Sequence, residues 1–117
     1  QRVFCVVGCG GDRETTKRPI MGKIAVQHST DAILTSDNPR TEDPEKILDQ
    51  VVAELAPHTF TRITDRREAI HYALSQAQAG DVVLVAGKGH EDYQIIGTTK
   101  HHFDDVEVVN DYFNHQS

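Results

Sequence analysis

The sequence has little of several features that mark particular classes of protein. Among 117 residues there are two cysteines, Cys5 and Cys9, and no further Cys or His pair stands near them at the spacing of a metal site. The apolar runs are far shorter than the roughly 20 residues that a membrane span needs. The first residues also lack the charged-then-apolar order of a signal peptide. We therefore expect a cytoplasmic protein with two free thiols, of which Cys5 lies in the core.

Positive charge is also scarce. The chain has 12 Lys and Arg against 18 Asp and Glu, which gives a formal net charge of -6, and the basic residues form no cluster. Such a charge repels nucleic acid and anionic membrane surfaces. We predict that the protein has neither a nucleic-acid partner nor a membrane partner.

Short apolar, β-branched segments alternate with helical patterns, which is typical of an α/β fold with a mostly parallel sheet. The expected strands are residues 3–8, 32–36, 60–64 and 82–86. The last is the most uniformly apolar, so we expect it at the centre of the sheet. The pattern predicts a single Rossmann-like domain flanked by helices. Because a buried strand starts almost at the first residue, we expect residues 1–117 to be a fragment that lacks its first element.

Capping residues predict where the helices start. Pro19 suits the first turn of one helix, and Asp43, which precedes a proline, caps a second. Asp65 with Glu68 three residues later forms the capping box of a third helix, which Gly80 ends.

A short antiparallel ribbon is expected near the C-terminus, through residues 93–96 and 100–103. A final helix follows, with Asp104 or Asp105 as its cap. The residues expected to form its buried stripe are Val106, Val109, Tyr112 and Phe113.

Three polar loops follow directly on predicted parallel strands. They are residues 8–13, 37–40 and 87–91. Ligands of open α/β sheets bind beyond the carboxyl ends of the strands, so we expect these loops to form one site.

The side chains of these loops suit a zwitterion. Arg13 and Arg40 can pair with a carboxylate in the forked geometry, while Glu91 and a backbone carbonyl can hold an ammonium group. Asp37 offers a further carboxylate. Asn38 adds an amide, and the glycines allow the backbone to approach a ligand closely. An amino acid is the simplest ligand with both charges.

Other interpretations remain open for each feature alone. Any of the three loops could be only a turn, since Gly, Asp, Asn and Pro favour turns. A dinucleotide site is disfavoured because residues 8–11 lack the G-x-G-x-x-G spacing. His101 and His102 are adjacent and would point to opposite faces of a strand, so we predict no metal site. The roles of Cys9, Lys88 and His90 stay open, and Cys9 is treated as an inert small residue.

Six stretches together resemble the Mur ligase family, specifically the members that add the third residue of the peptidoglycan stem peptide. The stretches are residues 7–13 (VGCGGDR), 17–22 (KRPIMG), 34–40 (LTSDNPR), 65–70 (DRREAI), 87–94 (GKGHEDYQ) and 102–105 (HFDD). They occur in the family's order and span essentially the whole chain. The resemblance implies a C-terminal, amino-acid-binding domain.

The resemblance also implies a substrate. Arg40 would bind the carboxylate at the non-reacting end of meso-diaminopimelate, and lysine-adding relatives typically lack this arginine. The residues implied to bind the amino acid are Arg13, Asp37, Asn38, Pro39, Arg40, Gly87 and Glu91. Asp12 resembles a residue used near the nucleotide.

The implied reaction joins diaminopimelate to UDP-N-acetylmuramoyl-L-alanyl-D-glutamate with ATP and Mg²⁺. The chain has no G-x-x-x-x-G-K-[ST] motif, so ATP, Mg²⁺ and the UDP-sugar are expected to bind mainly in N-terminal and central domains outside this sequence. We predict that the fragment carries no catalytic residue and is inactive alone. The alternative is a non-catalytic amino-acid-binding or sensing module built on the same domain.

Overall fold

The structure is a computed structural model that describes residues 1–11, 16–86, 93–96 and 98–114. The strands are β1 (Val3–Cys9), β2 (Asp31–Ser36), β3 (Thr61–Arg62), β4 (Val82–Ala86), β5 (Tyr93–Ile96) and β6 (Thr99–His102). The helices are α1 (Arg18–Gln27), α2 (Pro44–Val52), α3 (Arg66–Gln76) and α4 (Asp105–Asn114).

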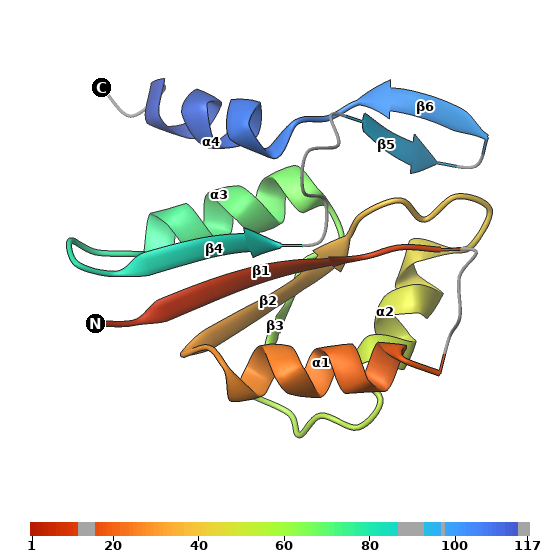
Figure 1. Cartoon of the computed structure of the whole chain (residues 1–117), viewed down its shortest axis with the longest axis horizontal. Helices are drawn as coiled ribbons and strands as arrows, with labels where there is room; N and C mark the ends of the chain where they lie inside the picture. The colour runs from red at the N-terminus through yellow and green to blue at the C-terminus, as the bar shows by residue number, and fades with distance from the viewer. Residues whose placement is uncertain (12–15, 87–92, 97, 115–117) are drawn as a thin grey trace.

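Within the described residues, β1 to β4 form a parallel sheet in the order β3-β2-β1-β4, and β5 and β6 form a separate antiparallel ribbon. The carboxyl ends of the parallel strands share one edge, and the ribbon lies beyond that edge (Figure 1). The predicted Rossmann-like α/β fold with a C-terminal ribbon is confirmed.

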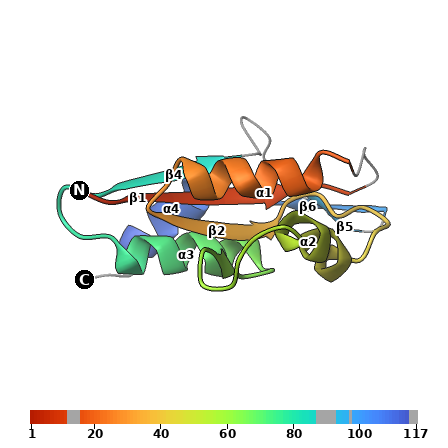
Figure 2. The same ribbon diagram turned by 90° about the horizontal axis from the view of Figure 1, so that it is seen from below.

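Helices cover both faces of the sheet because side chains alternate along the strands. Figure 2 shows α1 and α3 on opposite faces. On one face, Phe4 and Val6 of β1 pack with Ile70 of α3 and Val108 of α4. The buried residues of the other face come from β1, β2, α1 and α2, and they are Cys9, Ala25, Ala32, Leu34, Ile47, Leu48 and Val51.

The predicted caps are largely confirmed. The side chains of Asp43 and Asp65 accept hydrogen bonds from the backbone N–H groups of Glu45 and Glu68. Asp104, and not Asp105, caps α4, since its Oδ1 accepts from the N–H of Val106 at 2.8 Å. Each cap satisfies one of the N–H groups that a helix start leaves unpaired.

Several expectations about burial were wrong. In the described sheet β4 is an edge strand, and its Leu84 is 52% exposed, because the apolar run fits a sheet face that α1 only partly covers. Cys5 is half-buried for the same reason. In α4, Val106 and Phe113 are exposed and Val108 is the buried residue. Val109 and Tyr112 of the expected stripe are half-buried, and they pack against the core on the α3 side and against the ring of His71.

Two boundaries also differ from the prediction. β3 is shorter than residues 60–64, and α3 ends at Gln76 with Ala77 as its C-cap, before Gly80. Gly80 instead occupies the turn that follows, with φ of +92. Among the described residues, no helix is both long and apolar enough to cross a membrane.

An open apolar hollow of about 560 Å³ lies between α1 and the strands β1 and β4. Its lining includes Cys5, Val7, Met21, Ile24 and Ala86. Ile20 and Ile24 of α1 are largely exposed beside it. The hollow therefore leaves one part of the sheet without a full apolar cover.

Candidate functional site

The loop that follows β2 places four of the predicted site residues at the carboxyl edge of the sheet. Asp37 and Asn38 are buried, with 7% and 2% of their surfaces exposed, and they are followed by Pro39 and Arg40. Buried polar side chains directly after a parallel strand occupy the position where ligands of such sheets bind.

The loops after β1 and β2 are joined by backbone hydrogen bonds. The N–H of Asp37 donates to the carbonyl of Cys9 at 3.1 Å, and that of Gly11 donates to the carbonyl of Asn38 at 2.7 Å. A Cβ on Gly11 would lie 1.9 Å from the oxygen of Pro39, so the close contact requires glycine. The expected meeting of these two loops is confirmed by the structure; what they bind stays a prediction.

Arg40 adopts a left-handed backbone conformation, with φ of 55, which is uncommon for a residue other than glycine. Its Nη1 donates to the carbonyls of Gly11 at 2.9 Å and Asn38 at 3.3 Å. Both hydrogen bonds use Nη1 alone, whereas a guanidinium has five N–H donors. Backbone strain of this kind concentrates at functional sites.

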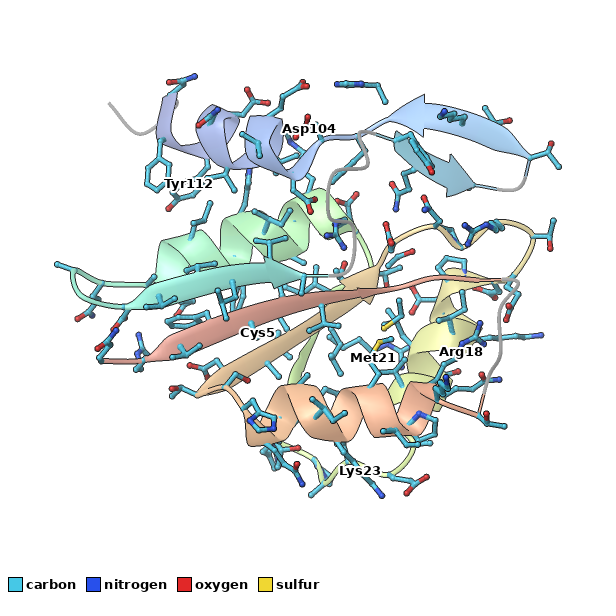
Figure 3. All side chains as sticks on the ribbon, in the orientation of Figure 1. Cys5, Arg18, Met21, Lys23, Asp104 and Tyr112 are labelled. Atoms are coloured by element: carbon cyan, nitrogen blue, oxygen red, sulfur yellow. The ribbon has the colours of Figure 1, made fainter. Side chains whose placement is uncertain are left out.

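Arg18 also contacts the place where the loops after β1 and β2 meet, although the sequence analysis gave it no role. Its side chain is buried and lies between α1 and α2 (Figure 3). Nη1 and Nη2 bind the two carboxylate oxygens of Glu42 at 3.0 and 2.9 Å, and Nη2 also donates to the carbonyl of Gly10 at 3.1 Å. In the sequence analysis Arg18 appears only as a member of the family stretch of residues 17–22.

Arg66, the first residue of α3, is a second buried cation at this edge. It is 1% exposed and binds Asp105 with two hydrogen bonds, from Nε at 2.8 Å and from Nη2 at 2.7 Å. Its Nη1 has no hydrogen-bond partner in the described part of the chain and lies against Gly8, where a Cβ would be 1.9 Å away. In the sequence analysis Arg66 appears only as a member of the stretch of residues 65–70, and neither its burial nor its pairing with Asp105 was predicted.

The ribbon contacts the loop after β2 in two ways. Nε2 of Gln94 donates to the backbone carbonyl of Asp37 at 2.5 Å, and the backbone of Arg40 forms an isolated parallel bridge with Ile96. Residues from β5 therefore lie beside the predicted ligand loop, far from it in sequence.

Cys9 is not a candidate nucleophile. Burial of its thiol raises its pKa from 9.0 to about 11; the charge of Asp37 adds to the rise, while Arg18 and Arg66 oppose it. A thiol with such a pKa stays protonated at neutral pH, and the thiolate is the reactive form. The treatment of Cys9 as an inert buried residue agrees with this environment.

The other predicted site residues, Asp12, Arg13, Gly87 and Glu91, lie outside the described residues, as do Lys88 and His90. Among the residues that are described, no three His, Cys, Asp or Glu side chains are grouped so that they could hold a metal ion.

Comparison with known proteins identifies the family. Residues 1–89 match the sequence model of the family that is described as "Mur ligase, glutamate ligase domain". The chain is 57% identical over 107 residues, 92% of its length, to the Bacillus cereus protein named UDP-N-acetylmuramoyl-L-alanyl-D-glutamate--2,6-diaminopimelate ligase, of which it covers 22%. To the Lactiplantibacillus plantarum protein of the same name it is 65% identical over 105 residues, 90% of the chain and 21% of that protein.

A solved structure with this ligase name superposes with a TM-score of 0.94 at 48% sequence identity, and the match covers 99% of this chain and 24% of that one. The chain thus spans about a fifth to a quarter of the length of these relatives. A family match over residues 1–89 and a superposition of nearly the whole chain agree with each other. The chain therefore belongs to the Mur ligase family.

Proposed function

We propose that this chain is the C-terminal, amino-acid-binding domain of a longer ATP-dependent ligase that adds meso-diaminopimelate to UDP-N-acetylmuramoyl-L-alanyl-D-glutamate in peptidoglycan synthesis. The observation that carries the proposal is Arg40, whose strained backbone and Nη1 contacts fix its guanidinium where the loops after β1 and β2 meet. The names of the similar ligases support the same substrate.

In this proposal the domain binds and orients the amine substrate. The N–H groups of Arg40 other than those that bind Gly11 and Asn38 take the distal carboxylate, with Asp37, Asn38 and Pro39 forming the wall around it. By the family resemblance, the proposal also assigns Arg13, Gly87 and Glu91 to the amino acid and Asp12 to the nucleotide. Holding the amine near the activated carboxyl of D-glutamate turns binding energy into proximity.

The remaining parts of the reaction belong to the rest of the longer enzyme. ATP, Mg²⁺ and the UDP-muramoyl dipeptide bind mainly outside residues 1–117. Two observations support the division: the chain matches about a fifth to a quarter of its relatives, and its apolar hollow is open. Phosphoryl activation of the D-glutamate carboxyl makes it reactive, and the amine nitrogen then displaces phosphate to form the amide.

Selectivity for the distal carboxylate tests the proposal. In the full-length enzyme we expect wild type to prefer meso-diaminopimelate to L-lysine strongly, since lysine would leave Arg40 unpaired. Arg40→Ala should lower kcat/KM for diaminopimelate by about 30-fold or more, because losing one partner of a desolvated charge pair costs about 2–5 kcal/mol. ATP-dependent product formation with each amine measures this.

Arg2→Ala is the control, because the side chain of Arg2 is 45% exposed and pairs with Asp31 and Asp81 at the amino ends of β2 and β4, the edge of the sheet opposite to the loop. It should leave the preference unchanged. A preference that survives Arg40→Ala would make Arg40 a turn residue. Binding of diaminopimelate without any ligase activity in the full-length protein would favour the sensing module.

A further inference from the structure

The ribbon of β5 and β6 lies across the carboxyl edge of the sheet, next to the loop that carries Arg40 (Figure 1). In β5, Gln94 and Ile96 share one face, because side chains alternate along a strand. Among the described residues of β5, Gln94 contacts the loop through its side chain and Ile96 through its backbone. One strand therefore contacts both ends of the segment from Asp37 to Arg40.

The two contacts act on the part of the loop that is least favourable by itself. Arg40 has φ of 55, and a left-handed conformation costs a non-glycine residue free energy unless its surroundings hold it. The backbone bridge to Ile96 holds Arg40, and the Gln94 hydrogen bond holds the carbonyl at the start of the loop. Without these contacts the loop could relax and turn the guanidinium away.

The ribbon can serve as a support because it is itself fixed to the body of the domain. His102 of β6 contacts both carboxylate oxygens of Glu107 on α4, at 3.0 and 2.9 Å. The adjoining Asp105 forms the buried bidentate pair with Arg66 of α3. A continuous series of contacts thus runs from α3 through α4 and the ribbon to the loop after β2.

We propose that Gln94 is a positioning residue that determines amine specificity: its side-chain amide holds the Asp37–Arg40 loop so that Arg40 faces the distal carboxylate of the amino acid. The inference rests on the proposed function. Gln94 itself touches no substrate in this scheme and acts through Arg40. Its effect is on recognition of a carboxylate-bearing amine, with the chemical step left unchanged.

The test compares Gln94→Met with wild type in the full-length enzyme. Methionine keeps the length of the side chain but cannot donate a hydrogen bond. We expect KM for meso-diaminopimelate to rise about 10-fold, because the loop loses a hydrogen bond that holds it, while kcat changes less than about 3-fold. KM for L-lysine should stay unchanged, so the ratio of the kcat/KM values for diaminopimelate and lysine falls. Gln94→Glu, which presents a carboxylate to the Asp37 carbonyl, should have a larger effect in the same direction.

Lys100→Ala is the matched control within the ribbon. Lys100 lies over the ring of Tyr93 at 4.2 Å, on the face of the ribbon opposite to Gln94. It should change neither KM nor selectivity. The double variant with Arg40→Ala identifies the route: if Gln94 acts through Arg40, then Gln94→Met adds no further loss in that background.

Each outcome separates this inference from the proposed function. If wild type shows no preference for diaminopimelate, the proposed function fails and the inference falls with it. If wild type shows the preference but Gln94→Met and Gln94→Glu both keep it, the function stands and the role of Gln94 is refuted. Equal losses of kcat for both amines, or losses that add to those of Arg40→Ala, would also refute it.

Discussion

Gly11 shows how much the proposed site depends on single residues. Its N–H binds Asn38, its carbonyl accepts from Arg40, and its missing Cβ lets the backbone of Pro39 approach. A main-chain oxygen cannot move aside as the end of a flexible side chain can. The junction of the two loops therefore has little tolerance for a methyl group at this position.

Gly11→Ala should lower the free energy of unfolding of the chain by about 1–3 kcal/mol, as overpacking does in tight contacts. Gly10→Ala is the control, since the nearest atoms to its Cβ would be Nη1 of Arg40 at 3.5 Å and the Asn38 oxygen at 3.6 Å. Urea unfolding of both variants measures the difference. Equal stability of the two variants would show that the loops separate without cost.

The buried thiol of Cys9 makes stability depend on alkaline pH. Its pKa is about 11 in the folded chain against an ordinary value of 9.0. As the pH rises through this window, the unfolded state loses its proton first, so unfolding becomes more favourable. We expect wild type to lose about 2–3 kcal/mol more stability than Cys9→Ala between pH 9 and 11, following the two-unit shift. Denaturant unfolding of both proteins at each pH measures this. An equal loss of unfolding free energy in wild type and Cys9→Ala would contradict the burial of this thiol.

At the scale of elements, two ion pairs join α3 to α4 and differ chiefly in burial. Arg66 and Asp105 pair with side chains that are 0% and 15% exposed, whereas Arg67 and Asp111 are 48% and 45% exposed. Breaking a buried pair leaves an uncompensated charge in a poorly solvated place. A surface pair is screened by water and contributes little.

Arg66→Ala should therefore destabilise the chain by about 3–5 kcal/mol. Arg67→Ala should cost less than about 1 kcal/mol, and added salt should reduce that small effect further. Thermal unfolding of the two variants gives the comparison. A small effect at Arg66 would mean that water reaches the space left by the guanidinium.

For the whole molecule, the apolar hollow beside α1 is the largest departure from an evenly covered sheet. Ile24 and Leu84 are 52% exposed each, on α1 and on the edge strand β4. Exposed apolar groups that gather in one region mark a binding or packing surface more often than scattered ones do. The exposed apolar surface agrees with the proposal that this domain belongs to a longer enzyme.

An apolar fluorescent dye such as anilinonaphthalenesulfonate should bind the isolated 117-residue chain at this hollow. Ile24→Ser and Leu84→Ser should each lower the fluorescence, because both remove apolar area from the same region. Val106→Ser removes an apolar group on α4 that is more exposed, at 67%, and should not lower the fluorescence. Similar fluorescence from all three variants would place the dye elsewhere.

The local features of this fold could be predicted from sequence because their causes are local. An Asp side chain caps a helix through N–H groups two or three residues away, as Asp43, Asp65 and Asp104 do. Alternating apolar segments likewise predicted the parallel strands. The placement of the loop after β2 beside the loop after β1 followed from a general property of parallel sheets.

Contacts between distant segments could not be predicted in the same way. Nothing near Gln94 in the sequence shows that its amide will meet Asp37, and nothing near Arg66 shows that Asp105 will share its burial. The apolar composition of residues 82–86 could not distinguish a central strand from an edge strand. The family resemblance identified the ligand loop, because the residues of that loop are contiguous in sequence. It gave Arg18 and Gln94 no separate role.

The sequence by itself determined the α/β class, the helix caps, the order of the loops and the membership of the Mur ligase family, because each depends on residue types at short, fixed spacings. The tertiary structure alone decided which strand lies at the edge, which charges are buried and what holds Arg40 in its left-handed conformation. These properties depend on which segments meet in space, and the chain sets that only through packing of the whole domain.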